Sequence, residues 1–194
     1  MNFLKNIYIW TLKKAEHKNA KWYLSLISFA ESSFFPIPPD ILLIPMALAS
    51  KTKALFYAFI CTLSSVLGGI FGYAIGYFFF NSIGLYIVEF YHLENSFSIF
   101  ENYYKEFGIL IVLGAGITPF PYKFITIASG VFGLNIYLFV IVSIIGRGFR
   151  FYLIAILLYF FGEKIKLFID KYFNILSITF FILLVGSVFI IRFL

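Results

Sequence analysis

The chain has 194 residues, of which 62% are hydrophobic and 12% are charged, and its formal net charge is +6. A soluble domain usually carries about 25% charged residues, so this composition argues against a soluble globular protein. Five of the fifteen Lys and Arg lie in the first 21 residues. The positive charge therefore indicates anionic lipid, and not nucleic acid, as the partner.

The apolar residues form long runs that contain no Asp, Glu, Lys, Arg or His. These runs cover residues 54–80, 124–146 and 172–191. Each is at least as long as the roughly 18–20 residues that a helix needs to cross a bilayer. The sequence therefore predicts an all-α integral membrane protein with several spans. Its expected location is a bacterial cytoplasmic (inner) membrane.

At the N-terminus, no uninterrupted apolar core or cleavage site of a signal peptide is recognised. Residues 1–21 are instead expected to be an interfacial basic segment, with an amphipathic helix over residues 2–18. A plain cytoplasmic tail is the alternative.

Residues 22–50 are apolar but interrupted, first by Glu31 and then by four residues close together. These are Pro36, Pro38, Pro39 and Asp40. Proline removes a helix donor, and each apolar flank is too short to span the bilayer. The pattern predicts a re-entrant hairpin of two half-helices, which needs protein or water around its turn.

The next element, residues 54–80, is a predicted full span. Gly68, Gly72 and Gly76 repeat at every fourth residue and so share one helix face. Small residues at this spacing allow another helix to approach closely, so their expected role is packing. Residues 81–107, which hold four Glu against one Lys, are predicted to form a surface helix in the interface.

Residues 107–133 repeat the interrupted pattern around Pro119 and Pro121, which are followed by Lys123. A span over residues 135–161 comes next. A polar link over residues 162–171 and a last span over residues 172–191 complete the chain. The expected organisation is an interfacial segment (1–21), a membrane domain (22–165) and a C-terminal transmembrane helix (166–194).

A shift of 83 residues places Pro36 on Pro119, Pro38 on Pro121 and Asp40 on Lys123. A hairpin returns to its starting side and a span crosses once, so the second copy would be inverted. Inverted repeats with discontinuous helices are typical of transporters. The lysine distribution predicts residues 1–21, 51–53 and 162–171 in the cytoplasm and residues 81–107 outside.

Five ionisable residues are expected at membrane depth, where charges are rare and usually functional. They are Glu31, Asp40, Lys123, Arg147 and Arg150. If both proline loops meet, pairing of these residues leaves one positive charge, which suits an anionic head group. Arg147 and Arg150 share a helix face and have the donor geometry to grip a phosphate.

Each of these residues also has a structural interpretation. The carboxylate of Asp40 favours a helix N-terminus without any function. Glu31 is either a carboxylate suited to proton coupling or the partner of Arg147 or Arg150 in a structural salt bridge. The two arginines either bind substrate or only neutralise the acids. Lys123 lacks a local structural reason, since a helix N-terminus disfavours cations.

No catalytic residue, metal site or cofactor is predicted. His17 and His92 have no metal-ligand partners at useful spacing, and no nucleophile-elbow, phosphate-loop or dinucleotide motif is present. The chain is therefore not expected to be an enzyme.

Several motifs together resemble the DedA superfamily, also called the VTT domain or SNARE-associated Golgi protein family, and its YqaA-like branch in particular. They are Glu31 with Pro36–Asp40, the Gly68, Gly72, Tyr73, Gly76 series, Gly116 to Lys123 with Gly130, and Gly146 to Phe151. The resemblance covers residues 22–165. It implies inverted re-entrant loops and lipid-related transport, such as polyprenyl-phosphate recycling or phospholipid scrambling.

The resemblance also places the family's acidic pair on Glu31 and Asp40. In the second loop, Ile117 and Lys123 stand where the family commonly has two arginines, so Arg147 and Arg150 are the expected substitutes. The leading hypothesis is a lipid flippase or scramblase. Assembly of the chain as a homo-oligomer is compatible with this hypothesis. The alternatives are a structural membrane protein without flux of its own, and a small-ion or solute transporter of the same architecture.

Overall fold

The computed structural model describes residues 19–35, 37–90, 92, 94–118, 120–162 and 164. The predicted interfacial helix over residues 2–18, the link beyond residue 164 and the last span over residues 172–191 lie outside the described residues, as do Pro36 and Pro119. Every regular element within the described part is helical.

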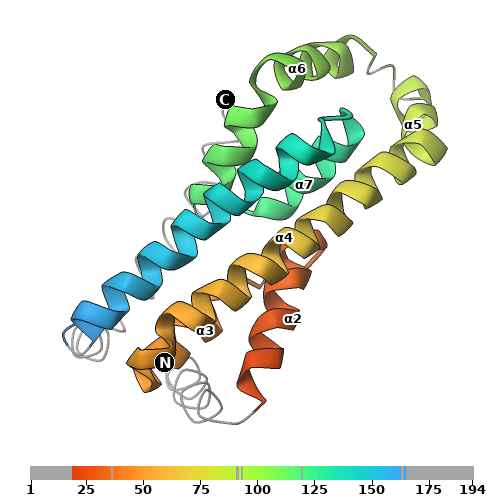
Figure 1. The fold of residues 1–194 in the computed structure, drawn as a ribbon. Coiled ribbons are helices and arrows are strands. Elements are labelled where there is room, and N and C mark those ends of the chain that lie inside the picture. Colours follow the sequence, from red (N-terminus) through yellow and green to blue (C-terminus); the bar gives the residue numbers. More distant parts are fainter. Residues whose placement is uncertain are drawn as a thin grey trace, which may run out of the picture.

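The helices follow one another with short connections (Figure 1). Their bounds are α2 Ala20–Ser33, α3 Asp40–Ala49, η1 Lys51–Lys53, α4 Ala54–Phe79, η2 Phe80–Gly84, α5 Leu85–Phe90, α6 Glu94–Ile117, α7 Tyr122–Val131 and the helix Ile136–Gly162, here called the 136–162 helix.

Two of these helical stretches are long and apolar enough to cross a membrane. They are Lys51–Phe79, which joins η1 to α4, and Ile136–Gly162. Both were predicted from the sequence to within a few residues. Asn135 begins the second one, because its side-chain oxygen accepts hydrogen bonds from the backbone N–H groups of Tyr137 and Leu138 at 3.0 and 3.2 Å.

The two long helices lie side by side and run antiparallel (Figure 1). The hydroxyl of Tyr73 donates to the Leu134 carbonyl at 2.7 Å, whereas Ser65, eight residues earlier on α4, contacts Arg147. The residue numbers of contacting partners therefore increase along one helix as they decrease along the other, as expected for antiparallel helices. This pair is the frame on which the shorter helices pack.

Both predicted proline breaks are present in the structure. The first lies between α2 and α3, and the second between α6 and α7. In Figure 1 the first broken pair begins and ends at the end of the molecule where α4 begins. The second pair begins and ends at the opposite end, so each broken pair turns back on itself.

The glycine face of α4 is where both broken pairs dock. A Cβ atom on Gly68 would overlap the backbone carbonyl of Phe29 in α2, and one on Gly76 would overlap that of Ile127 in α7. Gly72 lies between them and faces Thr126 of α7 and the carbonyl of Ser32. The predicted packing role of these glycines is therefore confirmed.

The predicted surface helix over residues 81–107 is wrong in its bounds. The chain forms the π-helical turn η2 and the short helix α5 first, and then turns at His92, whose φ is +52°. From Glu94 one continuous helix, α6, runs to Ile117. Nothing near Gly108 stops this helix, because a single glycine weakens a helix without ending it.

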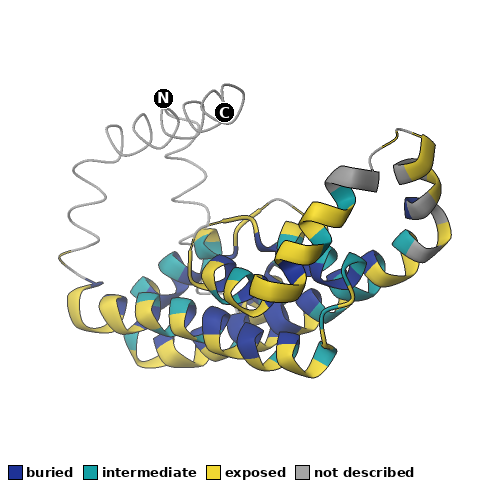
Figure 2. Ribbon diagram, turned by 90° about the horizontal axis from the view of Figure 1, so that it is seen from above, coloured by how far each residue is buried: buried dark blue, intermediate teal, exposed yellow. Residues whose placement is uncertain are grey.

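Buried residues lie mainly where the helices face one another, and exposed residues line their outer faces (Figure 2). Buried side chains include Glu31, Arg147 and several serines, whereas large apolar side chains are exposed along the long helices. On α4 these exposed residues form one stripe that includes Leu55, Phe59, Leu63 and Leu67.

Candidate functional site

A buried ion pair joins the end of α2 to the 136–162 helix. Arg147 Nη2 donates to Glu31 Oε2 at 2.5 Å, and the two side chains are only 1% and 10% exposed. Arg147 is the twelfth of the 27 residues in its helix, so the pair lies near the middle of that helix. A buried charge of this kind is tolerated only with a partner.

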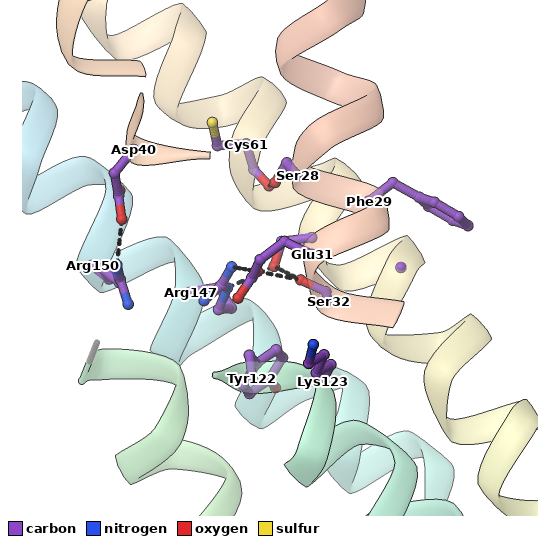
Figure 3. A network of polar contacts seen from close by, with 12 residues as sticks. Ser28, Phe29, Glu31, Ser32, Asp40, Cys61, Tyr122, Lys123, Arg147 and Arg150 are labelled. Carbon is purple, nitrogen blue, oxygen red and sulfur yellow. Dashed lines mark hydrogen bonds and ion pairs between the residues drawn. The ribbon is translucent and has the colours of Figure 1, made fainter. Parts of the chain in front are cut away.

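Two serines complete the coordination of this pair (Figure 3). Arg147 Nε donates to the Ser65 hydroxyl at 2.6 Å, and Ser65 is 2.7 Å from the Ser32 hydroxyl. The Ser32 hydroxyl also lies 3.1 Å from Glu31 Oε2. The four residues thus form a closed ring of polar contacts that draws on α2, α4 and the 136–162 helix.

Aromatic rings pack against the guanidinium group of Arg147. Its central carbon lies 4.9 Å from the ring centre of Tyr122 and 4.7 Å from that of Phe151. Cation–π contacts at these distances stabilise a desolvated guanidinium. Tyr122 is itself fixed by a hydrogen bond between its hydroxyl and that of Ser143 at 2.6 Å.

A second ion pair lies one helical turn further along the 136–162 helix. Arg150 Nη2 binds Asp40 Oδ2 at the start of α3, and Arg150 Nη1 donates to the Thr118 carbonyl at 2.6 Å. Arg150 therefore connects the first proline break with the second. The Oδ1 atom of Asp40 is buried with no hydrogen-bond partner among the described residues.

Lys123 is the fifth predicted residue, and it takes part in neither ion pair. It lies in the first turn of α7, half-buried, with its ammonium group 5.3 Å from the ring centre of Phe124. The Thr126 hydroxyl is 2.9 Å from both the Ser32 carbonyl and the Lys123 carbonyl. This contact holds the start of α7 next to the end of α2 (Figure 3).

The structure therefore brings four of the five predicted residues together as two pairs and leaves Lys123 beside them. The sequence reasoning left open which arginine each carboxylate would meet, and the geometry assigns Glu31 to Arg147 and Asp40 to Arg150.

Sequence reasoning missed the serines that line this region. Ser25, Ser28 and Ser32 recur at intervals of three and four residues, so they share one face of α2. That face packs on α4, where Ser25 contacts Ser64 at 2.7 Å and Ser28 donates to the Cys61 carbonyl at 2.7 Å. The helical spacing of these hydroxyls in an otherwise apolar stretch was the available signal.

No group of three or more His, Cys, Asp or Glu that could hold a metal ion occurs within the described ranges. The polar residues of the site form charge pairs and hydroxyl contacts in place of a metal-ligand cluster. Fold and site together define a class: a helical protein with two span-length helices, two proline-broken helix pairs and buried ion pairs between them.

Two bacterial proteins are similar to this chain, and both are described as uncharacterized. One, from Haemophilus influenzae, is 34% identical over 192 residues, which cover 99% of this chain and all of that protein. The other, from Histophilus somni, is 34% identical over 167 residues, which cover 84% of this chain and 85% of that protein. The chain belongs to the same family as these two proteins. No protein-family model matches the sequence, and no solved structure matches it.

Proposed function

We propose that this chain is a multi-pass integral protein of a bacterial inner membrane, related to the DedA superfamily, that moves lipids with anionic head groups across the bilayer. Support for the membrane comes from the exposed apolar side chains and from the buried ion pair. The exposed apolar stripe of α4 suits lipid tails, and the buried Glu31–Arg147 pair suits a protein interior surrounded by hydrocarbon.

Inverted repeats are part of this proposal. Each repeat consists of a proline-broken helix pair followed by a span: α2, α3 and α4 in the first, and α6, α7 and the 136–162 helix in the second. The antiparallel course of the two spans supports opposite orientations of the repeats. Discontinuous helices that meet near mid-depth form the substrate sites of many transporters built in this way.

The observation that carries the functional proposal is the charge balance where the two breaks meet. Glu31 and Asp40 are neutralised by Arg147 and Arg150, whereas Lys123 makes no ion pair within the described part of the chain. One positive charge is thus left at the break between α6 and α7. An anionic head group that enters from the bilayer would meet this charge first.

The arginines have a different role in this proposal. Arg147 is enclosed by protein, and Arg150 is only 14% exposed and holds both breaks in place. We assign them to the framework and Lys123 to the head group. This resolves, as a proposal, the choice between substrate binding and charge neutralisation.

A flux assay tests the proposal. Purified protein is reconstituted into liposomes that carry a fluorescent phospholipid, and the fraction accessible to a membrane-impermeant quencher is followed over time. A hydrogen bond to a charged group contributes about 1.5–3 kcal/mol, so Lys123→Gln should slow flux by about tenfold or more. Lys123→Arg should retain it, and the exposed control Lys53→Gln should behave as wild type.

Liposomes with protein that move neither phospholipid nor polyprenyl phosphate faster than empty liposomes would refute lipid transport. Equal flux in wild type and Lys123→Gln would refute the role of Lys123 while leaving transport in place.

A further inference from the structure

A polar cavity lies far from the ion pairs, at the other end of α4. Its volume is about 290 Å³, and the residues that line it include the aromatic residues Tyr77, Phe80, Phe97 and Phe132 together with Glu101. Tyr77 follows Ser65 by twelve residues on α4, which corresponds to about 18 Å at the helical rise of 1.5 Å per residue. The cavity is therefore separate from the site described above.

The aromatic wall of this cavity is built from rings that pack on one another. Phe97 stacks on Phe80 with ring centres 4.8 Å apart and contacts Phe132 with ring centres 5.2 Å apart. These rings come from η2, α6 and the end of α7, so three segments distant in sequence enclose one space. Aromatic rings carry negative charge density on their faces and attract cations.

Two further features of the cavity contribute negative charge, as the faces of the aromatic rings do. Glu101 places a carboxylate in the wall, and the last turn of α7, which ends at Val131, contributes to the lining. The carbonyl groups at a helix C-terminus carry the negative end of the helix dipole. Carboxylate, helix end and rings thus all favour a positively charged ligand.

The set of lining groups also selects the kind of cation. Calcium and magnesium prefer several oxygen ligands. The lining residues carry a single carboxylate, and the carbonyl groups of Ser129 and Gly130 at the end of α7 already accept backbone hydrogen bonds, whereas four of the lining residues are aromatic. Rings with a carboxylate are the usual surroundings of an organic ammonium group. We propose that this cavity binds an organic ammonium group, of the kind found in choline, in ethanolamine and in the head groups of the lipids that contain them.

Lys105 competes with such a ligand for Glu101. Its Nζ lies 2.7 Å from Glu101 Oε1, and the two side chains are 63% and 37% exposed. An exposed pair of this type, four residues apart on a helix, contributes little, so an ammonium ligand can replace it. Removal of the lysine charge should therefore strengthen ligand binding.

Calorimetric titration of the purified full chain in a maltoside detergent tests the site. Choline and ethanolamine are the soluble probes, and short-chain phosphatidylcholine, phosphatidylethanolamine and phosphatidylglycerol are the lipid probes. We expect saturable binding of the ammonium probes that depends on Glu101, whereas any binding of phosphatidylglycerol, which lacks an ammonium group, should be unchanged in Glu101→Gln. Binding of the free amines would identify a soluble ligand, and binding of the lipids alone would identify a head-group site.

Three variants separate the site from general effects on the protein. Glu101→Gln should weaken binding at least tenfold, Lys105→Gln should strengthen it several-fold, and Glu106→Gln, an exposed acid of the same helix outside the cavity, should leave it within twofold of wild type. A gain of affinity in Lys105→Gln cannot arise from misfolding.

Failure of every ammonium probe to bind wild-type protein would overturn the inference, as would equal losses in the Glu101→Gln and Glu106→Gln variants. The measurement requires no transport, so its outcome is independent of the flux assay.

Discussion

Removal of one partner of the Glu31–Arg147 pair should destabilise the protein strongly. Both side chains are buried. When Arg147 is replaced by glutamine, the carboxylate of Glu31 keeps only its contact with the Ser32 hydroxyl. Removal of one partner of a buried ion pair costs about 3–5 kcal/mol, because the remaining charge is buried without a partner and without water to solvate it. This loss corresponds to a decrease of about 100- to 4,000-fold in the ratio of folded to unfolded protein.

The double variant should lose less unfolding free energy than the sum of the losses of the two single variants. In Glu31→Gln with Arg147→Gln, both buried charges are removed together, so neither remains unpaired. We expect a coupling free energy of about 2–3 kcal/mol. The exposed pair Glu101–Lys105 is the matched control, and its cycle should give less than about 1 kcal/mol.

Equilibrium unfolding in mixed micelles, with increasing mole fraction of a denaturing detergent and helicity as the signal, measures both cycles. A cost below about 1 kcal/mol for Glu31→Gln alone would contradict the reasoning. So would a coupling free energy no larger than that of the control pair.

Two further predictions concern packing and topology. Gly68→Ala should destabilise the protein by about 1–3 kcal/mol, because the new methyl group meets a backbone carbonyl that cannot move aside, whereas Gly114→Ala, with open space around it, should not; the same unfolding assay compares them. A cysteine at Ile37 should resist an impermeant thiol reagent added from outside, and one at the 78% exposed Tyr137 should react with it. Exclusive labelling of Ile37 from outside would contradict the re-entrant topology, and the buried Cys61 should contribute no background.

The elements that were predicted well are those with local signals. Proline near residues 36–39 and 119–121 ends a helix wherever the chain goes, so both breaks could be placed from the sequence. The lengths of α4 and of the 136–162 helix followed from uninterrupted apolar runs. The glycine face also followed, because helical spacing alone determines which residues share a face.

The elements that were predicted poorly depend on contacts. Polarity changes near Gly108, and this change was interpreted as the end of a surface helix, although α6 continues through it. The turn at His92 contains no glycine or proline from which it could be predicted. The pairing of Glu31 with Arg147 could not be chosen over Arg150, because the two arginines are one turn apart and sequence gives no distances.

The cavity lined by Phe80, Phe97, Glu101 and Phe132 was missed for a related reason. Phe97 falls within the predicted interfacial helix over residues 81–107, and its partners Phe80 and Phe132 lie 17 and 35 residues away in the chain. Such a cluster has no spacing rule, so only the folded arrangement shows it.

The two ion pairs have a consequence for biosynthesis. Arg147 follows Glu31 by 116 residues, and Arg150 follows Asp40 by 110. At a synthesis rate of about 5–20 residues per second, both acids wait roughly 5–25 seconds before the ribosome adds their partners. In the proposed bilayer setting, the first half of the nascent chain therefore lacks the partners that neutralise Glu31 and Asp40 during this interval. The two carboxylates gain their ion-pair partners only when the 136–162 helix has been synthesised.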